Sequence, residues 1–352
     1  MARAAFWAGR GCGRTSPNPS VGAVVVDADG IVVGQGTTAP AGGPHAEVVA
    51  LEAAGSRARG GTLYVTLEPC SHTGRTGPCV ERVVAAGVRR VVVAVADPNP
   101  RVAGRGLAFL LAHGIPVTLG VGRTDASAQH AAFFTWVTRG RPWVVAKAAV
   151  SADGFVGPGD RPVRLTGRIA DRYFQRQRAA IDAIAVGAGT VLVDDPRLTA
   201  REVYRARPLV RVVFDWRGRV PASARLFSTR SSGPVIMVTS TTTRERRAAH
   251  FVALERLGIE IEVFEDRALR PVLERLGRRN IVSLLVEGGP ALHDALADAD
   301  VIDRVQAVVT PHVLGAGVPA AAIVRRTLAS GTGRAQVLGA DRLTECDVHR
   351  ID

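Results

Sequence analysis

The chain has 352 residues, of which 47% are hydrophobic, and this length favours two domains over one. It contains no run of about 18 apolar residues, and its first residues lack the apolar core of a secretory signal, so we expect neither a membrane span nor secretion. Four cysteines are too few for a disulfide framework in a chain of this size. Together these features favour a cytoplasmic protein with reduced thiols.

The net charge of +13 first suggests a nucleic-acid partner. Two observations argue against that partner: the cations are scattered, and all but one of the 45 are arginine, with Lys147 as the exception. Such a preference for arginine over lysine is typical of genome composition acting on surface positions, which would explain the positive charge without a partner. The main alternative is that the charge attracts a phosphorylated small molecule. With 5% aromatic residues, the chain also offers few platforms for stacked bases. We therefore expect neither a nucleic acid nor a membrane as partner.

The first half predicts a helix, two strands joined by a turn at Asp29-Gly30, and then alternating strands and helices. This order indicates an α/β layered domain. The expected elements are helices over 2–11, 105–113 and 124–138, helices that begin at His45 and Pro78, and strands over 21–26, 31–33, 62–67, 90–96 and 115–119.

Three metal-binding side chains occur within this region. His45, Cys70 and Cys79 supply the imidazole and thiolates that zinc prefers, and a catalytic zinc keeps three protein ligands with one position open for water. Glu47 follows the histidine by two residues, close enough to transfer protons without being a ligand. Zinc deaminases carry His-x-Glu followed by Pro-Cys-x-x-Cys, but here eight residues separate the two cysteines.

The favoured chemistry is hydrolytic loss of an exocyclic amine from a cytosine-like or aminopyrimidine ring. Three alternatives stay open at this point. His72 could complete a purely structural zinc site with four protein ligands. The chain could be a zinc-stabilised binding protein with a degenerate site, or it could deaminate nucleosides or nucleic acids by the same chemistry.

The second half begins where Arg139-Gly140-Arg141-Pro142 interrupts a helix, so we place the domain boundary there and expect domains over 1–140 and 141–352. Gly187-Ala188-Gly189 after a strand predicts either a phosphate-binding or a plain tight turn. Gly288-Gly289-Pro290 stands at the start of a predicted helix, where free backbone amides can bind a phosphate group. Residues 325–352 carry no recognisable motif. The expected elements are strands over 143–150, 181–186, 209–214, 234–239, 259–263 and 284–287, and helices over 168–180, over 243–257 and after Pro290.

Short motifs occur in both halves. They are Thr15-Ser16-Pro17-Asn18-Pro19, His45-Ala46-Glu47, the Cys70–Cys79 loop with Gly74-Arg75-Thr76, Asp97-Pro98-Asn99-Pro100, Lys147 with Ser151-Ala152-Asp153-Gly154, Gly187-Ala188-Gly189-Thr190, Asp194-Asp195-Pro196, and Val286-Glu287-Gly288-Gly289-Pro290. Together they resemble the family of bacterial bifunctional riboflavin-biosynthesis deaminase/reductases across nearly the whole chain, including the long loop between the cysteines. The resemblance implies an α/β protein with an N-terminal cytidine-deaminase-like three-layer domain and a C-terminal dihydrofolate-reductase-like domain.

The resemblance also implies substrates, cofactors and roles. The first domain would use one zinc ion per chain to deaminate a phosphoribosylamino-diaminopyrimidine, and the second would use NADPH to reduce its ribosyl group to ribityl. The family further implies a homo-oligomer, dimeric or larger. The residues implied for the substrate are Asn18, His72, Arg75, Asp97, Asn99, Lys147, Arg178, Leu198, Arg201 and Glu287, and those for NADPH are Thr166, Thr190, Asp194, Gly288 and Gly289.

One departure from the family pattern falls in the cofactor region. Arg164 stands where the resemblance leads us to expect a tryptophan. The side chain that would stack on the cofactor is therefore absent, and we include Arg164 among the cofactor residues because an arginine could meet the 2′-phosphate of NADPH. This departure leaves one more alternative, a deaminase whose reductase domain is degenerate.

Overall fold

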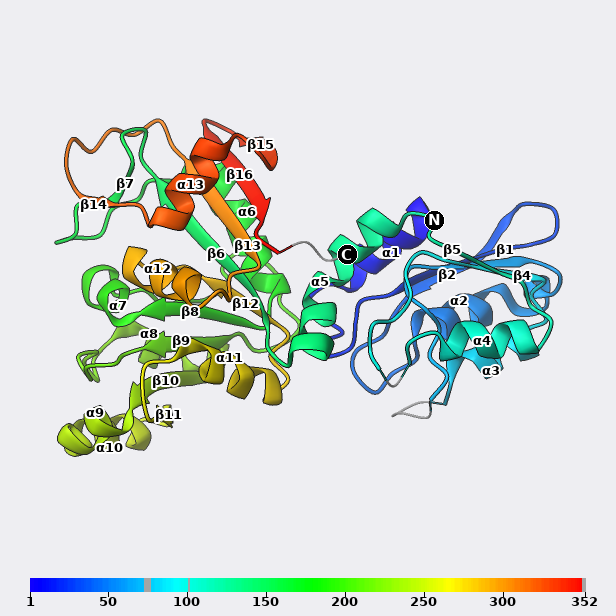
Figure 1. Ribbon diagram of the computed structural model, residues 1–352, viewed down its shortest axis with the longest axis horizontal. Coiled ribbons are helices and arrows are strands. Elements are labelled where there is room, and N and C mark those ends of the chain that lie inside the picture. The colour runs from blue at the N-terminus through cyan, green and yellow to red at the C-terminus, as the bar shows by residue number, and fades with distance from the viewer. Residues whose placement is uncertain (73–76, 101, 350–352) are drawn as a thin grey trace. The chain divides into compact units, whose positions relative to one another are not determined.

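The computed structural model describes residues 1–72, 77–100 and 102–349, and the chain divides into two compact units (Figure 1). The first unit is Met1–Gly140, and the second begins at Arg141. Arg75, one of the candidate substrate residues, lies outside the described ranges. Within those ranges, no helix combines the length and the apolar character needed to cross a membrane.

The first unit is built on a five-stranded sheet with the order β2-β1-β3-β4-β5. β1 runs antiparallel to β2 and β3, whereas β3, β4 and β5 are parallel to one another. The strands are β1 (Gly22–Val26), β2 (Val32–Thr37), β3 (Thr62–Val65), β4 (Arg90–Val93) and β5 (Val117–Leu119). The helices are α1 (Ala2–Gly11), α2 (Ala46–Ala54), α3 (Cys79–Ala85), α4 (Arg105–Ala112) and α5 (Arg123–Arg139), with a 3-10 turn η1 (Gly55–Ala58) after α2.

Two glycines let helices approach opposite faces of this sheet. A Cβ on Gly22 of β1 would lie 1.9 Å from the carbonyl oxygen of Ala4 in α1, and one on Gly34 of β2 would lie 2.0 Å from that of Ala50 in α2. Gly34 pairs with Val25, three residues from Gly22 along β1, so the two glycines face opposite sides. The unit therefore has three layers, helix on sheet on helix.

The second unit contains a nine-stranded sheet with the order β11-β10-β9-β8-β12-β6-β13-β16-β15. The strands from β11 to β13 in this order are parallel, and β16 and β15 continue the sheet antiparallel. A separate two-stranded ribbon pairs β14 with β7. The strands are β6 (Trp143–Val150), β7 (Phe155–Gly157), β8 (Ala183–Gly187), β9 (Val210–Phe214), β10 (Val235–Ser240), β11 (Glu260–Phe264), β12 (Ser283–Val286), β13 (Arg304–Val309), β14 (Val318–Pro319), β15 (Arg334–Leu338) and β16 (Asp341–Asp347).

Helices cover this sheet (Figure 1), and its central strands are apolar almost throughout, as expected for parallel strands buried on both faces. The helices are α6 (Arg168–Ala180), α7 (Ala188–Asp194), α8 (Arg225–Ser228), α9 (Thr241–Arg246), α10 (Ala248–Arg256), α11 (Leu269–Arg278), α12 (Pro290–Asp298) and α13 (Ala322–Ser330), with a 3-10 turn η2 (Arg230–Ser232).

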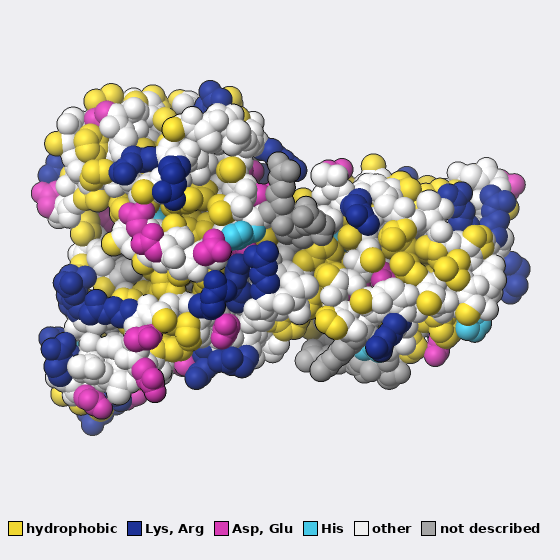
Figure 2. All heavy atoms as spheres, in the orientation of Figure 1, with side chains coloured by type: hydrophobic (Ala, Val, Ile, Leu, Met, Phe, Trp, Pro, Cys, Tyr) yellow, Lys and Arg dark blue, Asp and Glu magenta, His cyan; other side chains and the backbone are white. Residues whose placement is uncertain are grey.

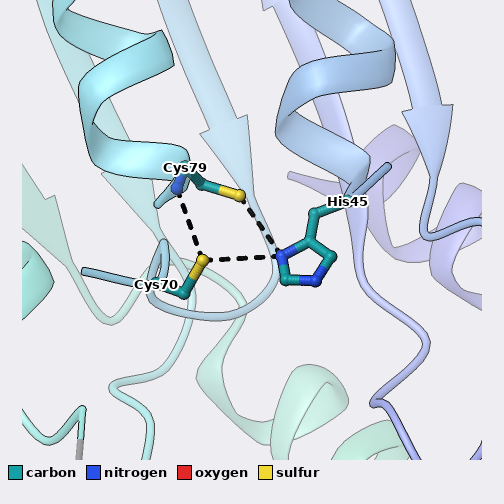
Figure 3. Close-up of side chains that lie close together, drawn as sticks. All are labelled: His45, Cys70 and Cys79. Atoms are coloured by element: carbon teal, nitrogen blue, oxygen red, sulfur yellow. Dashed lines mark hydrogen bonds between the residues drawn. The ribbon is translucent and has the colours of Figure 1, made fainter. Parts of the chain in front are cut away.

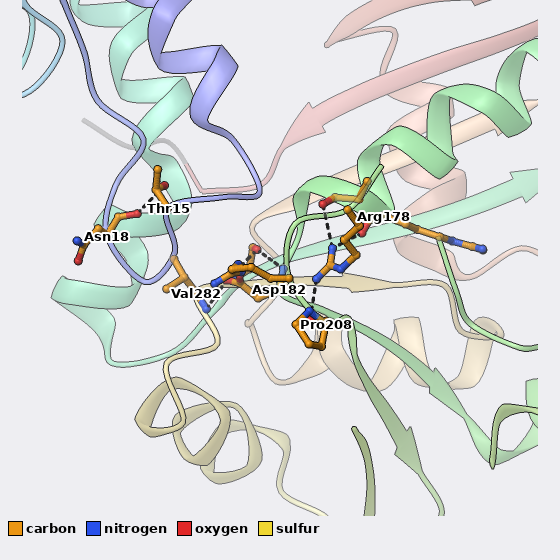
Figure 4. A network of polar contacts seen from close by, with 10 residues as sticks. Thr15, Asn18, Arg178, Asp182, Pro208 and Val282 are labelled. Atoms are coloured by element: carbon orange, nitrogen blue, oxygen red, sulfur yellow. Dashed lines mark hydrogen bonds and ion pairs between the residues drawn. The ribbon is translucent and has the colours of Figure 1, made fainter. Parts of the chain in front are cut away.

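Buried carboxylates fasten loops to the sheet of the second unit. Asp182 accepts hydrogen bonds from the backbone amides of Val282 and Ser283 at 2.9 and 3.0 Å, and Figure 4 shows the contact with Val282. The carboxylate of Asp303 accepts hydrogen bonds from both terminal nitrogens of Arg141, at 2.6 and 2.9 Å. Both side chains are almost fully buried. Breaking such a buried pair by removing one partner is strongly destabilising.

The structure corrects two expectations about the second half and adds elements that were not predicted. The helix expected over 243–257 is divided into α9 and α10 at Arg247. The Gly187-Ala188-Gly189 segment is not a turn, because α7 begins at Ala188 directly after the extended residue Gly187. The helix α11 was not among the predicted elements, and its Pro271 lies in the first turn, where a proline is tolerated. The tail after residue 325 completes α13 and adds β15 and β16 to the sheet.

Candidate active sites

The expected zinc ligands of the first unit lie at the starts of two helices and after one strand. His45 is the N-cap residue of α2, in an extended conformation that follows Gly42-Gly43-Pro44. Cys70 comes five residues after β3, and Cys79 is the first residue of α3, preceded by Pro78. Residues far apart in the sequence therefore meet because the helix starts and the strand end lie on the same side of the unit.

The three side chains converge on one point (Figure 3). Nδ1 of His45 lies 3.5 Å from Sγ of Cys70 and 3.3 Å from Sγ of Cys79. A tetrahedral zinc ion with a nitrogen ligand at about 2.0–2.1 Å and sulfur ligands at about 2.3 Å places nitrogen and sulfur about 3.5 Å apart, so the residues fit that ion. In the described part of the chain, this is the one cluster of His, Cys, Asp and Glu that could hold a metal, and it does not include His72.

The pKa values of the two cysteines are shifted in opposite directions because the side chains interact. The hydrogen bond from Cys79 lowers the pKa of Cys70 to about 4, with His45 adding to this effect and burial opposing it. The same interaction with Cys70, together with burial, raises the pKa of Cys79. The backbone amide of Cys79 also donates to Sγ of Cys70 at 3.4 Å. Cysteine binds zinc as a thiolate, so any proton that the pair retains is released when the metal binds.

Glu47 lies in the first turn of α2 with its carboxyl group buried and is only 3% exposed. Burial, and secondarily the thiolate of Cys70, raises the pKa of Glu47 to about 7. A carboxyl group with a pKa near the working pH can both accept and return a proton. The environment therefore gives Glu47 the property that a general acid–base group needs.

A cavity of about 290 Å³ opens onto these side chains. His45, Glu47 and Cys70 line it, together with four of the substrate residues implied by the resemblance, which are Asn18, His72, Asp97 and Asn99. Phe133 and Trp136, on α5, also line the cavity and were missed by the sequence interpretation. They lie far along the chain from the metal ligands, and ordinary core helices carry aromatic side chains with the same spacing, so the sequence carries no specific signal for them.

Local hydrogen bonds hold two of the cavity-lining loops. Thr15 donates its hydroxyl hydrogen to the carbonyl oxygen of Asn18 at 3.0 Å (Figure 4). Asp97 accepts a hydrogen bond from the backbone amide of Asn99 at 2.8 Å. Burial raises the pKa of Asp97 to about 6, with smaller contributions from Glu68 and Cys70. These contacts hold the backbone of Asn18 and Asn99, and both residues line the cavity.

The second unit contains a larger cavity, of about 1310 Å³. Glu287, Gly288 and Gly289, which directly follow β12, line it, as does Thr190 of α7, and ligands of open α/β sheets bind beyond the carboxyl ends of strands. Every substrate and cofactor residue expected in this half lines it except Leu198, which is buried and lines a smaller cavity of about 350 Å³ shared with Arg178, Asp194 and Arg201. The members of the larger set are Lys147, Arg164, Thr166, Arg178, Thr190, Asp194, Arg201, Glu287, Gly288 and Gly289.

Three charged side chains that line the larger cavity interact with one another. Arg178 donates to both carboxylate oxygens of Glu287, from Nε at 2.8 Å and from Nη2 at 2.5 Å. Nζ of Lys147 lies 4.5 Å from the centre of the Phe174 ring. Burial lowers the pKa of Lys147, and Glu287 partly opposes that effect. Burial would raise the pKa of Glu287, but Arg178 and Lys147 hold it at about 2, so its carboxylate is charged.

Backbone contacts position the other residues of this cavity. The carbonyl oxygens of Arg178 and Pro208, both labelled in Figure 4, accept hydrogen bonds from the side chain of Arg205 at 2.7 and 3.1 Å. The amide of Gly289 donates to the hydroxyl oxygen of Thr190 at 3.1 Å, which joins α7 to the residue before α12. Gly289 is the N-cap of α12, where backbone amides favour an anionic group.

Arg164 lines the cavity but has a carboxylate partner. Its Nη2 lies 2.5 Å from Oδ2 of Asp171, and the hydroxyl group of Thr166 also donates to Asp171. The side chain of Arg164 is 67% exposed. Its charge is therefore partly offset by Asp171, and a phosphate group would have to compete with that carboxylate.

Comparisons with known sequences bear on both units. Residues 1–95 match the family described as the cytidine and deoxycytidylate deaminase zinc-binding region, and residues 142–325 match the RibD C-terminal domain. Fold, site geometry and these matches define an enzyme in which a zinc-binding deaminase domain precedes a reductase domain. The predicted fold class, cytidine-deaminase-like followed by dihydrofolate-reductase-like, is thereby confirmed.

Full-length relatives narrow this class. The riboflavin biosynthesis protein RibD of Escherichia coli K12 is 38% identical over 328 residues, which cover 90% of this chain and 88% of the relative. That of Aquifex aeolicus is 38% identical and covers 87% and 84%. Among solved structures, Acinetobacter baumannii RibD matches with a TM-score of 0.84 and 34% sequence identity. A Thermotoga maritima deaminase/reductase matches with a TM-score of 0.84 and 32% sequence identity. Both matches cover 98% of this chain and 96% of the chain in the solved structure. The chain belongs to the RibD family of bifunctional deaminase/reductases.

Proposed function

We propose that this chain catalyses two successive reactions of riboflavin biosynthesis on a phosphorylated pyrimidine. The Thermotoga maritima relative is named as a diaminohydroxyphosphoribosylaminopyrimidine deaminase and 5-amino-6-(5-phosphoribosylamino)uracil reductase, and we assign both activities to this chain. The observation that carries the proposal is the meeting of His45, Cys70 and Cys79 beside a buried Glu47, in a cavity lined by polar and aromatic side chains.

His45, Cys70 and Cys79 would hold one zinc ion per chain, and when bound the ion would supply an acidified water molecule at its open position. Glu47 accepts a proton from the attacking water and delivers it to the ring nitrogen. Glu47 then takes the second proton from the hydroxyl group added to the ring carbon and transfers it to the departing amine, so one water molecule is consumed, a carbonyl group forms on the ring and ammonia leaves. The pKa of about 7 lets Glu47 act in both directions near neutral pH.

The cavity walls would bind the pyrimidine. Phe133 and Trp136 provide faces on which the ring can stack, while Asn18 and Asn99 provide amide groups for its polar edge. His72 and Asp97 lie on the same cavity. Aromatic faces alone would also suit a splayed nucleic-acid base, but the family membership and the second catalytic unit favour the small-molecule substrate.

In the second unit, NADPH would supply the hydride that reduces C1′ of the sugar and converts the ribosyl group to ribityl. Lys147 and the Arg178–Glu287 pair would bind and orient the sugar, with Leu198 and Arg201 beside them. Thr166, Thr190 and Asp194 would face the cofactor, and the amides around Gly288 and Gly289 would receive its phosphates. Arg164 would contribute to the 2′-phosphate only by giving up part of its contact with Asp171.

The remaining expectations belong to the same proposal. The partners are a phosphorylated small-molecule pyrimidine and other copies of this chain in a dimer or larger oligomer, with neither nucleic acid nor membrane involved. The compartment is the cytoplasm, where reduced cysteines are retained.

The direct experiment is incubation with the diaminopyrimidine phosphoribosyl substrate with and without NADPH, followed by mass spectrometry. Without NADPH, deamination replaces an amine by oxygen and raises the mass by about 1 Da; with NADPH, reduction adds about 2 Da more. An unchanged substrate under both conditions with zinc-loaded protein would refute the proposal. Accumulation of the deaminated species despite NADPH would leave the degenerate-reductase alternative in place of the full function.

A further inference from the structure

Glu68 is a buried acidic residue of the first unit that none of the proposed roles uses. It lies between β3 and the metal ligand Cys70, only two residues before that cysteine, and it is 4% exposed. An acidic side chain is rarely buried without partners, because removing its charge from water is costly. Its surroundings therefore indicate what the carboxylate does.

Four backbone amides donate hydrogen bonds to this one carboxylate. Oε2 accepts from the amides of Asp97 and Gly104, both at 3.1 Å. Oε1 accepts from the amides of Gly106 and Leu107, at 2.9 and 3.3 Å. A carboxylate has about four acceptor positions, so its hydrogen-bonding capacity is filled. Two of the donors belong to the first turn of α4, whose amides have no partners within the helix.

The close approach of Gly106 provides a second, independent observation. A Cβ at that position would lie 2.1 Å from the carbonyl oxygen of Pro69 and 3.1 Å from Oε1 of Glu68. Only a glycine lets the start of α4 come this near to the segment that carries Cys70. The sequence thus supplies both the acceptor and the space that the contact requires.

The contact joins the metal-binding and substrate-binding parts of the deaminase cavity. Cys70 follows Glu68 through Pro69, which restricts the backbone between them. On the other side, the amide of Asp97 is held by Glu68, and Asp97 in turn accepts from the amide of Asn99. Glu68, Cys70, Asp97 and Asn99 all line the same cavity.

We infer that Glu68 is a positioning residue for deamination, which sets the place of Asp97 and Asn99 relative to the metal ligand Cys70. The inference rests on the proposed deaminase function of the first unit. Glu68 acts through the loop that it holds and need not touch the substrate. A misplacement of about 1 Å in such a loop can reduce a reaction about a hundredfold.

Glu68→Gln is the principal test, since glutamine has nearly the same shape but presents an NH₂ group to two of the four amide donors. We expect faster hydrogen exchange at the amides of Asp97, Gly104, Gly106 and Leu107. We also expect kcat/KM for deamination to fall by about tenfold to a hundredfold, mainly through a higher KM. Zinc stoichiometry and the NADPH-dependent reduction of separately supplied deaminated substrate should be unchanged.

Asp27→Asn is the matched control in the same unit. Asp27 is also buried and accepts two backbone amides, from Asp29 and Ile31, but it serves the turn between β1 and β2 and does not line the cavity. We expect this variant to lower stability without changing the KM for deamination. Gly106→Ala, which keeps the carboxylate but displaces α4, should raise KM in the same way as Glu68→Gln.

A double-mutant cycle of Glu68→Gln with Asn99→Ala separates positioning from general stability. If the two residues act together, the double variant should lower kcat/KM for deamination by less than the product of the two separate effects. Additive losses, or a wild-type KM in Glu68→Gln despite faster amide exchange, would overturn the inference. Loss of zinc in proportion to activity would overturn it as well. If Glu68→Gln does not fold, Gly106→Ala decides, and a wild-type KM there overturns the inference. Failure of the proposed function itself is distinguishable, because wild-type protein would then not deaminate the substrate at all.

Discussion

The two cavities of this chain hold their charged groups in different ways. In the first unit, burial raises the pKa of Glu47 to about 7 against a smaller opposing effect of His45, so Glu47 can exchange a proton. In the second unit, Glu287 is buried against Arg178 and Lys147 and its pKa is held at about 2, so it stays charged. The difference shows that one carboxylate is suited to proton transfer and the other to binding and orientation.

The metal ligands should give the largest effect that separates the two sites. Cys79→Ala removes one of three donors, so we expect loss of bound zinc and of deamination, with the reductase reaction retained. The measurements are zinc content and both activities on the same preparation. Cys12→Ala is the control, because Cys12 lies in the same unit but belongs to no metal cluster within the described residues. Loss of both activities in Cys79→Ala would show that the units are not separable.

Glu47→Gln should retain zinc and lose proton transfer. We expect deamination to fall by about 10²- to 10⁴-fold, the usual contribution of a general acid–base group. Glu52→Gln, on the same helix and 60% exposed in a pair with Arg82, is the matched control and should keep full activity. Full activity in Glu47→Gln with metal bound would exclude Glu47 as the proton carrier.

The Arg178–Glu287 pair should matter for the second unit alone. Arg178→Met leaves Glu287 buried without its bidentate partner, so we expect the unit to lose about 3–5 kcal/mol of stability and reduction to be abolished, with deamination unchanged. Calorimetry and the two assays provide the readout. Arg244→Met, which breaks a more exposed pair with Glu255, should cost no more than about 1 kcal/mol. Equal costs for the two variants would contradict the special role of the buried pair.

Acid should affect the first unit through His130, which is 2% exposed and contacts the hydroxyl group of Thr66 at 3.2 Å. Burial lowers the pKa of His130 to about 4 from the ordinary value of 6.5. A histidine that stays neutral in the folded protein does not reduce the free energy of unfolding above pH 6.5. As the pH falls from 6.5 to 4, the unfolded chain takes up a proton that the folded protein does not, and the free energy of unfolding decreases. The loss is up to about 3 kcal/mol.

His130→Gln should reduce the decline in stability of the first unit between pH 6.5 and 4. Calorimetric scans of the wild-type protein and of this variant across that pH range measure the effect. His113→Gln is the control, because His113 is exposed at the end of α4. If wild type and His130→Gln decline in parallel, His130 is not the group that makes the first unit sensitive to acid.

The smallest effect is expected at Arg164. Because the guanidinium is exposed and already paired with Asp171, Arg164→Ala should change the KM for NADPH by no more than about fivefold, equivalent to about 1 kcal/mol. Comparison of NADPH with NADH isolates any contribution to the 2′-phosphate. Loss of the preference for NADPH would place Arg164 at that phosphate after all.

The two sites also differ in how far the sequence predicts them. His45, Glu47, Cys70 and Cys79 could be singled out because zinc chemistry requires those residue types and a helix start follows the histidine. Phe133 and Trp136 could not, since ordinary core helices carry the same aromatic pattern. Glu68 gave no signal of its own, because its partners are backbone amides that no side-chain identity reveals.

In the second half, the central strands were predictable from their apolar runs, whereas the edge of the sheet was not. Trp143–Val150 has the predicted bounds, but β15 is largely exposed and lacks the apolar run of a buried strand. The cavity there joins residues from Lys147 to Leu338. Only the resemblance to a family indicated which of these residues belong together, since paired charges such as Arg178 and Glu287 are common throughout proteins.

The central claim is that one imidazole and two thiolates share a zinc ion that keeps a position open. X-ray absorption at the zinc edge of the purified, metal-loaded protein measures this directly. We expect one nitrogen ligand at about 2.0–2.1 Å, two sulfur ligands at about 2.3 Å and one oxygen from water. A fourth protein ligand in place of that oxygen, or a shell without sulfur, would contradict it.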